Sequence, residues 1–344
     1  MLKFNLPHRY SVALLPIAFL LLLTACSKDD EPTVAFQEPD LKTYIDRFVA
    51  EAAQRGEDID LSQLEAVFVP SIERNGRTFC GWGYSNYQGT GQPRIEIVNS
   101  GFCWNDRTDL EKENLFFHEI GHAILRRPHI NIRLDNTLPK SMMCDQCDQF
   151  RLYTDFSLHR RDYYINELLN PSAAVPEWAE RKTNFNLVWE DGITSDTDWG
   201  FGTASDFVTG SVDDSGQING EFALKIASTQ RDTQHFGAWG LGIDDLDIPQ
   251  GATVRLEVTL KTGEPMLGDG AAVAIRTDAN SRSVDFFTTQ GRQFYTGSLA
   301  NQVVTVTLPD YSASVELINI FLIYLTNTTG EVFFDDIKLY VAED

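Results

Sequence analysis

The feature that most constrains this chain is the H-E-x-x-H motif formed by His118, Glu119 and His122. On a helix, residues four positions apart lie on one face, so both imidazoles point the same way. This is the spacing at which two histidine nitrogens can bind one Zn²⁺. Glu119 would lie beside the metal without being a natural ligand. Its carboxylate could take a proton from a zinc-bound water and pass it to a leaving amine.

Flanking residues predict the helix that the motif needs. Thr108 and Glu111 have the spacing of a capping box at the start of a helix. Asp109 and Glu111 would stand in the first turn, and Arg126 and Arg127 in the last, where the helix dipole favours each charge. An apolar stripe at helical spacing should face a core, and it contains Phe117, Ile120, Gly121 and Ile124.

His129 is the nearest candidate for a third metal ligand. If the helix ran straight on, His129 would lie roughly 16 Å along the axis from His118, too far for both to bind one ion. Pro128 cannot continue a helix without losing a hydrogen bond and clashing with the previous turn. We therefore expect the helix to end near Arg126 or Arg127, after which the chain can bend back and bring His129 to the metal.

A downstream S-x-M sequence, Ser141-Met142-Met143, completes a pattern that resembles the metzincin metallopeptidases over roughly residues 41–169. The resemblance implies one catalytic Zn²⁺, Glu119 as general base and Met143 in a methionine turn below the metal. The implied zinc ligands are His118, His122 and His129. The family pattern is H-E-x-x-H-x-x-G-x-x-H. Here the third histidine comes one residue later, and Leu125 stands in place of the turn glycine.

Another residue offers an alternative third ligand. Leu158–Leu169 has the apolar pattern of a helix that packs under the site, and Asn170-Pro171 should end it. Glu167 on this helix could bind the zinc, as a glutamate on a later helix does in thermolysin-like enzymes. His129 is closer in sequence and remains the favoured ligand.

The N-terminus has the pattern of an export signal. Lys3 and Arg9 precede an apolar run from Val12 to Leu23, which is too short to span a membrane comfortably. Leu23-Thr24-Ala25-Cys26 resembles a bacterial lipobox, which implies cleavage after residue 25 and lipidation of Cys26. The charged residues that follow resemble the surface-export signal of Bacteroidetes lipoproteins. We expect a signal peptide over 1–25, a tether over 26–38, and a lipid-anchored protein on the outer face of the outer membrane.

The remaining four cysteines fit an oxidising compartment. Cys80, Cys103, Cys144 and Cys147 allow three pairings, and we favour Cys80–Cys103 with Cys144–Cys147. Binding of a metal by the C-x-x-C pair is the alternative. The formal net charge of −22 argues against nucleic acid and anionic membrane surfaces as partners, so the lipid would be the only membrane contact. No feature indicates a structural Ca²⁺, although one is compatible with the sequence.

The segments before the motif predict a helix packed on a sheet. Leu41–Ala53 has helical apolar spacing and should end at Gly56. β-rich segments follow at 64–69, 77–81 and 94–99. By resemblance to metzincins, Arg94–Val98 would be the edge strand that pairs with substrate.

From about residue 185 the pattern changes to alternating apolar segments separated by Gly, Asp, Asn and Pro turns. This predicts an all-β sandwich of about 155 residues. The closing segment Gly330–Leu339 resembles the last strand of carbohydrate-binding jelly rolls and galactose-binding-like modules. Trp239 is expected to be buried, although an exposed tryptophan there could stack on a sugar.

The sequence thus predicts an α+β zincin-like catalytic domain over 39–180, followed by an all-β sandwich (jelly-roll) domain over 185–344. We expect an extracellular zinc-dependent endopeptidase that acts on proteins or peptides, with glycans as possible ligands of the second domain. The alternative is a surface glycan- or protein-binding lipoprotein whose metallopeptidase domain is degenerate. The main evidence for this alternative is that the third histidine comes one residue later than in the family pattern. The main evidence against it is that Glu119 is present.

Overall fold

The computed structural model describes residues 35–147, 150–216 and 218–343. The export signal, Cys26 and most of the expected tether lie outside the described residues. The end of that tether is described. Gln37 forms a parallel bridge with Ala66, so these residues already belong to the folded chain. Among the described residues, no helix is both long and apolar enough to cross a membrane.

Helix α1 (Pro39–Gln54) forms where the apolar spacing predicts it. Gly56 follows with φ of +80°, a conformation that glycine adopts readily, and so ends the helix as predicted. The buried face carries Leu41, Tyr44, Ile45, Phe48 and Ala52.

A three-stranded sheet follows, with the order β1 (Glu65–Val69), β5 (Arg94–Val98) and β4 (Gly81–Tyr84). β1 is parallel to β5, and β4 is antiparallel to it. The predicted role of β5 as the edge strand is therefore wrong. β5 is the central strand, buried along most of its length, and β4 is an edge.

The segment predicted as one strand over 77–81 divides into two structures. Its first residues form β3 (Arg77–Thr78), which pairs with β2 (Glu73–Arg74) in a small hairpin. Its last residue, Gly81, begins β4. The two glycines of β4 give a weak strand signal, because glycine has no side chain to pack.

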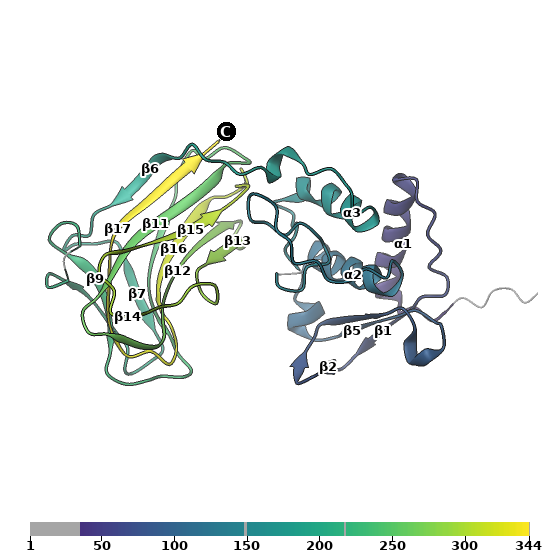
Figure 1. The fold of residues 1–344 in the computed structure, drawn as a ribbon, viewed down its shortest axis with the longest axis horizontal. Helices are drawn as coiled ribbons and strands as arrows, with labels where there is room; N and C mark the ends of the chain where they lie inside the picture. The colour runs from purple at the N-terminus through teal and green to yellow at the C-terminus, as the bar shows by residue number, and fades with distance from the viewer. Residues whose placement is uncertain (1–34, 148–149, 217, 344) are drawn as a thin grey trace, which may run out of the picture. The chain divides into compact units, whose positions relative to one another are not determined.

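Helix α2 (Asp109–Ala123) carries the H-E-x-x-H motif and begins with the predicted capping box between Thr108 and Glu111. It ends at Ala123 with Ile124 as its cap, a full turn before Pro128 and earlier than predicted. Arg126 has φ of +54°, so the chain turns at this residue and Pro128 meets a helix that has already ended. In Figure 1, the helices α1, α2 and α3 lie on the same side of the sheet that contains β1 and β5.

Helix α3 (Arg161–Leu169) continues a 3₁₀ turn, η3 (Leu158–Arg160), over the predicted segment. A π-turn, η2 (Gly101–Asn105), precedes α2, and two further 3₁₀ turns lie at η1 (Tyr87–Gly89) and η4 (Glu177–Ala179). One apolar core joins α1, the sheet, α2 and α3, and it includes Phe48, Ile95, Phe117, Met143 and Leu168.

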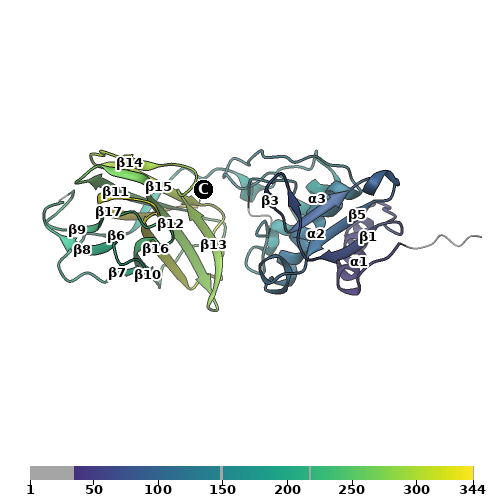
Figure 2. The same ribbon diagram turned by 90° about the horizontal axis from the view of Figure 1, so that it is seen from below.

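The segment from Asn186 onward folds as two antiparallel sheets, as predicted (Figures 1 and 2). One sheet contains β7 (Gly200–Thr203), β10 (Gly237–Ile243), β16 (Leu317–Tyr324), β12 (Met266–Ala279), β13 (Arg282–Thr288) and β14 (Tyr295–Gly297). The other contains β8 (Thr209–Asp213), β9 (Ala223–Ser228), β17 (Gly330–Ala342), β11 (Thr253–Thr262), β15 (Gln302–Leu308) and β6 (Asn186–Asp191).

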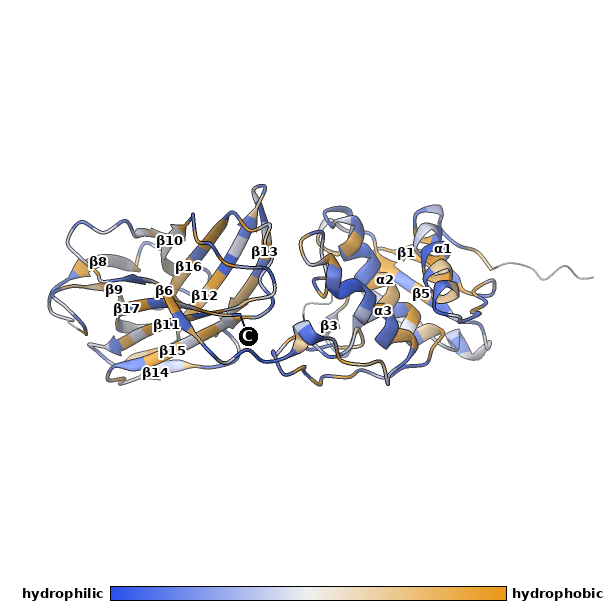
Figure 3. Cartoon of the chain, turned by 90° about the horizontal axis from the view of Figure 1, so that it is seen from above, coloured by the Kyte–Doolittle hydropathy of each residue, from blue (hydrophilic) through white to orange (hydrophobic). Residues whose placement is uncertain are grey.

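The sandwich core lies between these sheets. The predicted alternating residues point into it from both sides, and Figure 3 shows the alternation as orange and blue bands along the strands. Leu256 of β11 and Ile320 of β16 are fully buried there. Trp239 is also buried, and its indole N–H donates to the carbonyl of Lys225, so it packs in the core as expected.

Candidate metal centre

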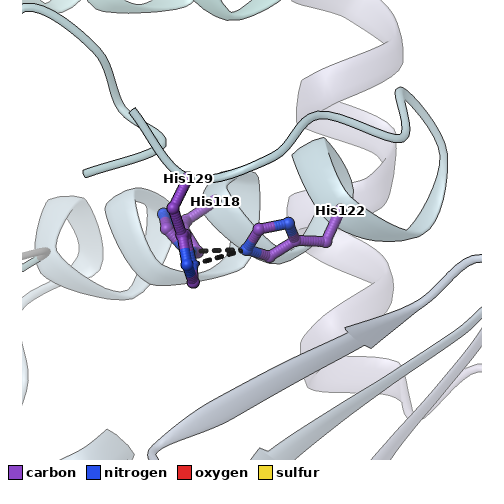
Figure 4. Close-up of side chains that lie close together, drawn as sticks. All are labelled: His118, His122 and His129. Carbon is purple, nitrogen blue, oxygen red and sulfur yellow. Dashed lines mark hydrogen bonds between the residues drawn. The ribbon is translucent and has the colours of Figure 1, made fainter. Parts of the chain in front are cut away.

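Three imidazoles converge at the C-terminal end of α2 (Figure 4). His118 and His122 come from the helix, and His129 comes from the loop that follows it. The Nε2 atom of His122 lies 3.2 Å from that of His118 and 2.9 Å from that of His129. The turn at Arg126 thus brings His129 back to the helix, as the sequence requires for a shared ion. Among the described residues, these three form the group of His, Cys, Asp or Glu side chains suited to a metal ion.

Backbone carbonyls fix the proton on the first two rings. Nδ1 of His118 lies 2.7 Å from the carbonyl oxygen of Met142, and Nδ1 of His122 lies 2.8 Å from that of Arg127. A carbonyl only accepts hydrogen bonds, so each Nδ1 carries the proton and donates it. In a neutral imidazole the other nitrogen then offers a lone pair. The Nε2 lone pairs of both histidines therefore point to the same place.

A carboxylate orients the third ring. Nδ1 of His129 lies 3.4 Å from an oxygen of Asp145, which favours a proton on Nδ1 and a lone pair on Nε2. Both side chains are partly exposed, at 42% and 39%. His129 is therefore held less firmly than His118, whose side chain is buried.

This arrangement suits a small tetrahedral cation. Zinc–nitrogen bonds of 2.0–2.1 Å at tetrahedral angles place neighbouring nitrogens about 3.3 Å apart. The two separations from His122, 3.2 and 2.9 Å, are close to that value, and all three ligand atoms lie within 4.8 Å of one another. Lone pairs at such distances repel one another unless a cation lies between them. His118, His122 and His129 could hold Zn²⁺ and leave its fourth position open toward a substrate.

Burial keeps the two helix histidines neutral. Burial and, after it, the neighbouring His122 together lower the pKa of His118 to about 3. Burial also lowers the pKa of His122. At neutral pH, His118 and His122 therefore do not take up a second proton. A metal ion needs neutral imidazole and is favoured by the same condition.

Glu119 lies between α2 and the edge strand β4. Its side chain is buried, and burial raises its pKa to about 8, while a hydrogen bond from the Gly83 backbone opposes the rise. A nearby cation would also favour the ionised form. A Cβ on Gly81 would lie 2.6 Å from the Glu119 carboxylate, and one on Gly83 would meet the Glu119 carbonyl. Both glycines are therefore required for β4 to approach the helix.

Met143, the predicted methionine-turn residue, packs against the helix that carries the motif. It is fully buried, and its sulfur would collide with a Cβ on Gly121, between the two helix histidines. Its carbonyl accepts a hydrogen bond from the N–H of Ile130, the residue after His129. Met143 thus supports both the helix and the loop that carry the three imidazoles.

Glu167 is not part of the histidine group and has a different role. One carboxylate oxygen accepts a hydrogen bond from buried Arg127 at 2.5 Å, and the other accepts from Ser141 at 2.8 Å. The Ser141 hydroxyl in turn accepts from the N–H of Met143. Glu167 therefore joins the two segments whose carbonyls, at Arg127 and Met142, orient the helix histidines.

The turn residue is Arg126 and not Leu125, which stands in the glycine position of the family pattern. Arg126 adopts the left-handed conformation that glycine favours, and it precedes His129 by three residues. The spacing between turn residue and third histidine is therefore that of G-x-x-H. The extra residue falls before the turn, which explains how a late histidine still reaches the site.

The four described cysteines pair as favoured. Cys80 bonds to Cys103 and so joins β4 to the turn before α2, while Cys144 bonds to Cys147. With both thiols in a disulfide, the C-x-x-C pair is not a thiolate metal site, and that alternative is wrong. Asp145 lies inside this small ring, beside His129.

An open cleft of about 920 Å³ contains the histidines and Glu119. β4 and the hairpin before it form one part of its lining, and residues after the methionine turn form another. Sequence reasoning missed Asp145 and Arg127 as partners of the ligands. The only available signal was their position next to a ligand or to the methionine turn.

No family model matches this chain, and no curated protein matches it. Solved structures with some similarity include a family 11 carbohydrate-binding module of a cellulosomal cellulase from Clostridium thermocellum. It has a TM-score of 0.31 and 13% identity, over 45% of this chain and 95% of that one. The xylan-binding CBM22-1 domain of Paenibacillus barcinonensis Xyn10C has a TM-score of 0.32 and 11% identity, over 46% and 96%. The enzymatically active domain of bacteriophage CBA120 tailspike protein 4 has a TM-score of 0.31 and 12% identity, and this chain covers 19% of its length.

Proposed function

We propose that this protein is a zinc-dependent peptidase that acts outside the cell. The observation that carries the proposal is the convergence of the His118, His122 and His129 imidazoles beside a buried glutamate, Glu119, that is not one of the three. Zn²⁺ held there would polarise the scissile carbonyl and lower the pKa of a water molecule to about 7.

Glu119 supplies the proton transfers. Its carboxylate takes a proton from the attacking water and later donates it to the nitrogen of the leaving amine, so no external acid or base is needed. Its contacts with Gly81 and Gly83 keep the side chain beside β4. A scaffold that only bound metal would have no need of a carboxylate in this position.

The edge strand β4 would hold the substrate. A strand at the edge of a sheet leaves N–H and C=O groups unpaired on one side, and an extended peptide can pair with them. Gly81, Trp82 and Gly83 all line the cleft with Glu119. A peptide bound along β4 would therefore cross the metal centre.

Metal analysis and a peptide-library digest of the zinc-loaded chain test the proposal, with Glu119→Gln as the decisive variant. The variant should retain zinc, because no ligand is removed, and should lose cleavage by about 10²- to 10⁴-fold. Glu180→Gln is a matched control, since Glu180 is an exposed acid outside the cleft. A zinc-loaded wild type that cleaves no peptide in a diverse library would contradict the proposal.

Glycan binding by the sandwich is the second candidate. Its support is a shallow groove of about 480 Å³ on the sheet that contains β7, β10 and β16. Gly202 and Ala238 line the groove with little or no side chain. Phe236, which is 55% exposed, and His235 also line it. Apolar rings with adjacent polar groups suit stacking against a sugar face.

A glycan array tests this second candidate. Wild-type protein should bind a subset of polysaccharides, and Phe236→Ala should abolish that binding without changing zinc content. Unchanged glycan binding in Phe236→Ala would place the ligand elsewhere. Binding by a zinc-free protein that cleaves no peptide would favour the binding-protein alternative as the whole function.

The proposed location is the bacterial outer membrane, through a lipid on Cys26. Cys26→Ser should move the protein from the membrane fraction to the soluble fraction. A variant that stays in the membrane fraction with an unchanged N-terminal mass would contradict lipidation.

A further inference from the structure

The charge of the cleft differs from that of the chain. The whole sequence has 50 acidic and 28 basic side chains. The cleft lining has the opposite balance, because its described carboxylates are Glu119 and Asp145. The arginines that line it are Arg77, Arg107, Arg126, Arg127 and Arg151. The cleft lining is therefore richer in basic than in acidic side chains, unlike the chain as a whole.

Some of these arginines already have protein partners. Arg127 is buried and paired with Glu167. Arg107 lies 3.4 Å from a Glu111 carboxylate oxygen, and its guanidinium lies over the ring of Phe150 at 3.9 Å. Arg151 reaches the same Glu111 oxygen at 3.7 Å. These three contribute positive potential, but their geometry is set by the protein.

Arg77 and Arg126 differ from them. Both are exposed, and neither side chain forms an ion pair with any residue in the described part of the chain. Arg77 belongs to the hairpin next to the edge strand, whereas Arg126 belongs to the turn that leads to His129. They therefore approach the cleft from two separate segments.

Arg126 also occupies a costly backbone conformation. Its φ of +54° is in the left-handed region, where a residue with a Cβ is less stable than glycine. Strain of this kind tends to persist where the side chain has a function. This turn therefore places a guanidinium that forms no ion pair with any described residue at the edge of the histidine site.

We propose that the cleft selects peptides with a side-chain carboxylate close to the scissile bond, and that Arg126 and Arg77 are the specificity-determining residues. This inference rests on the proposed peptidase function and names its substrate class. A guanidinium recognises a carboxylate through paired N–H donors. The basic side chains of the cleft lining would also attract an acidic peptide.

Peptide binding to zinc-loaded Glu119→Gln protein tests the proposal without requiring cleavage. The probe is a short fluorescent peptide of alternating alanine and glutamate with an amidated C-terminus, compared with a twin that has glutamine at each glutamate position. Amidation separates side-chain recognition from capture of a terminal carboxylate. We expect the glutamate peptide to bind several-fold more tightly in fluorescence anisotropy, with a difference that shrinks as salt is added.

Arg126→Gly and Arg77→Gln, each added to Glu119→Gln, should reduce the ratio of the two affinities by about two- to five-fold. Arg126→Gly supplies the residue that the turn prefers, so its thermal midpoint should not fall and misfolding cannot explain the loss. Arg181→Gln is the matched control, since Arg181 is exposed and outside the cleft. It should leave the ratio unchanged.

Equal binding of the two peptides would overturn the proposal, as would an equal effect of Arg181→Gln and Arg126→Gly. The library digest judges the proposed function separately. Cleavage without a preference for acidic residues would overturn the specificity and leave the peptidase function standing. A preference in binding without any cleavage would support an acidic-peptide site and contradict the peptidase function.

Discussion

The core below the metal centre and the core of the sandwich are built differently. Beneath the metal centre, several charged groups are buried among apolar residues, namely Glu113, Glu119, Arg127 and Glu167. The cluster between the sandwich sheets consists of apolar side chains such as Leu256 and Ile320. Burying charges gives little or no net stability even when they are paired. We therefore expect these buried charges to orient neighbouring groups more than they stabilise the core below the histidines.

The network around Glu113 illustrates this difference. Its carboxylate is fully buried and accepts hydrogen bonds from Arg47, Arg161 and Tyr153. It lies on α2, on the same helix as the histidines. The most buried acid of the sandwich, Asp335, instead accepts from the backbone N–H groups of Asn219 and Asp336, and so ties the segment between β8 and β9 to β17.

The largest expected effect comes from His118→Ala. Zinc affinity should fall by more than the roughly 10- to 100-fold typical of losing an outer partner, because a ligand itself is removed. Competition with a chromogenic chelator measures this loss. The β-sheet signal of the sandwich should persist in circular dichroism. Zinc binding at wild-type affinity would show that His118 is not a ligand.

Glu167→Gln should come next, with effects on both stability and metal binding. Arg127 would keep a buried charge without a counter-charge, which costs about 3–5 kcal/mol in denaturant unfolding. Zinc affinity should also fall by about 10- to 100-fold, because the segments that orient His118 and His122 loosen.

A double variant separates these two effects. Glu167→Met combined with Arg127→Met removes both charges and should recover most of the unfolding free energy. It should not recover zinc affinity, because Ser141 still lacks its acceptor. Full recovery of both quantities would reduce Glu167 to a purely structural residue.

Leu256→Ala tests the core of the sandwich in the same way. Removing a fully buried leucine should destabilise the sandwich by about 3 kcal/mol through lost packing and a cavity. Zinc affinity at 25 °C should remain within about two-fold of wild type, since the change lies outside the metal-centre core. A large loss of zinc affinity would mean that the two cores fold as one cooperative unit.

Gly121→Ala should have a moderate effect. The added methyl group meets the sulfur of Met143, and overpacking of this kind costs about 1–3 kcal/mol. Met143→Ala in the same chain provides room and should reverse part of the loss of Gly121→Ala. If Met143→Ala restored none of the unfolding free energy lost in Gly121→Ala, the contact with the Met143 sulfur would not be the cause of that loss.

The smallest effect, and one of opposite sign, is expected for Arg126→Gly in the otherwise unchanged chain. Relief of the left-handed arginine should raise the unfolding free energy by about 1 kcal/mol. Gly192→Ala is a useful control, since Gly192 has open space around its Cβ direction and no left-handed φ. A destabilised Arg126→Gly would mean that the arginine side chain holds the turn together.

Local rules predicted the helix that carries His118 and His122. The capping box and the four-residue spacing of His118 and His122 depend on a few adjacent residues, which the sequence shows directly. The pairing of Arg127 with Glu167 depends on chain segments that are forty residues apart, and no local pattern reports it. Likewise, an arginine in a left-handed turn follows no propensity rule, so the helix was predicted to end near Arg126 or Arg127 and not at Ala123.

The same distinction applies to strands. β11 and β15 alternate cleanly, because one face meets the core and the other meets solvent. β16 was not singled out because its second face is also apolar. Ile323 and Phe321 pack on that side with Ala272 and Ala274, so the alternation is weak. β4 was missed for the opposite reason, since its glycines give almost no hydrophobic signal.

The two glycines of β4 also limit how such a protein can evolve. Neither position can accept a side chain without moving the strand away from Glu119, so selection would remove nearly every substitution at Gly81 or Gly83. Trp82, between them, carries no such restriction. Descendants of this chain would therefore vary the cleft lining through Trp82 and the loops at the cleft rim. The G-x-G spacing upstream of H-E-x-x-H would remain as an inherited marker by which distant relatives could be found.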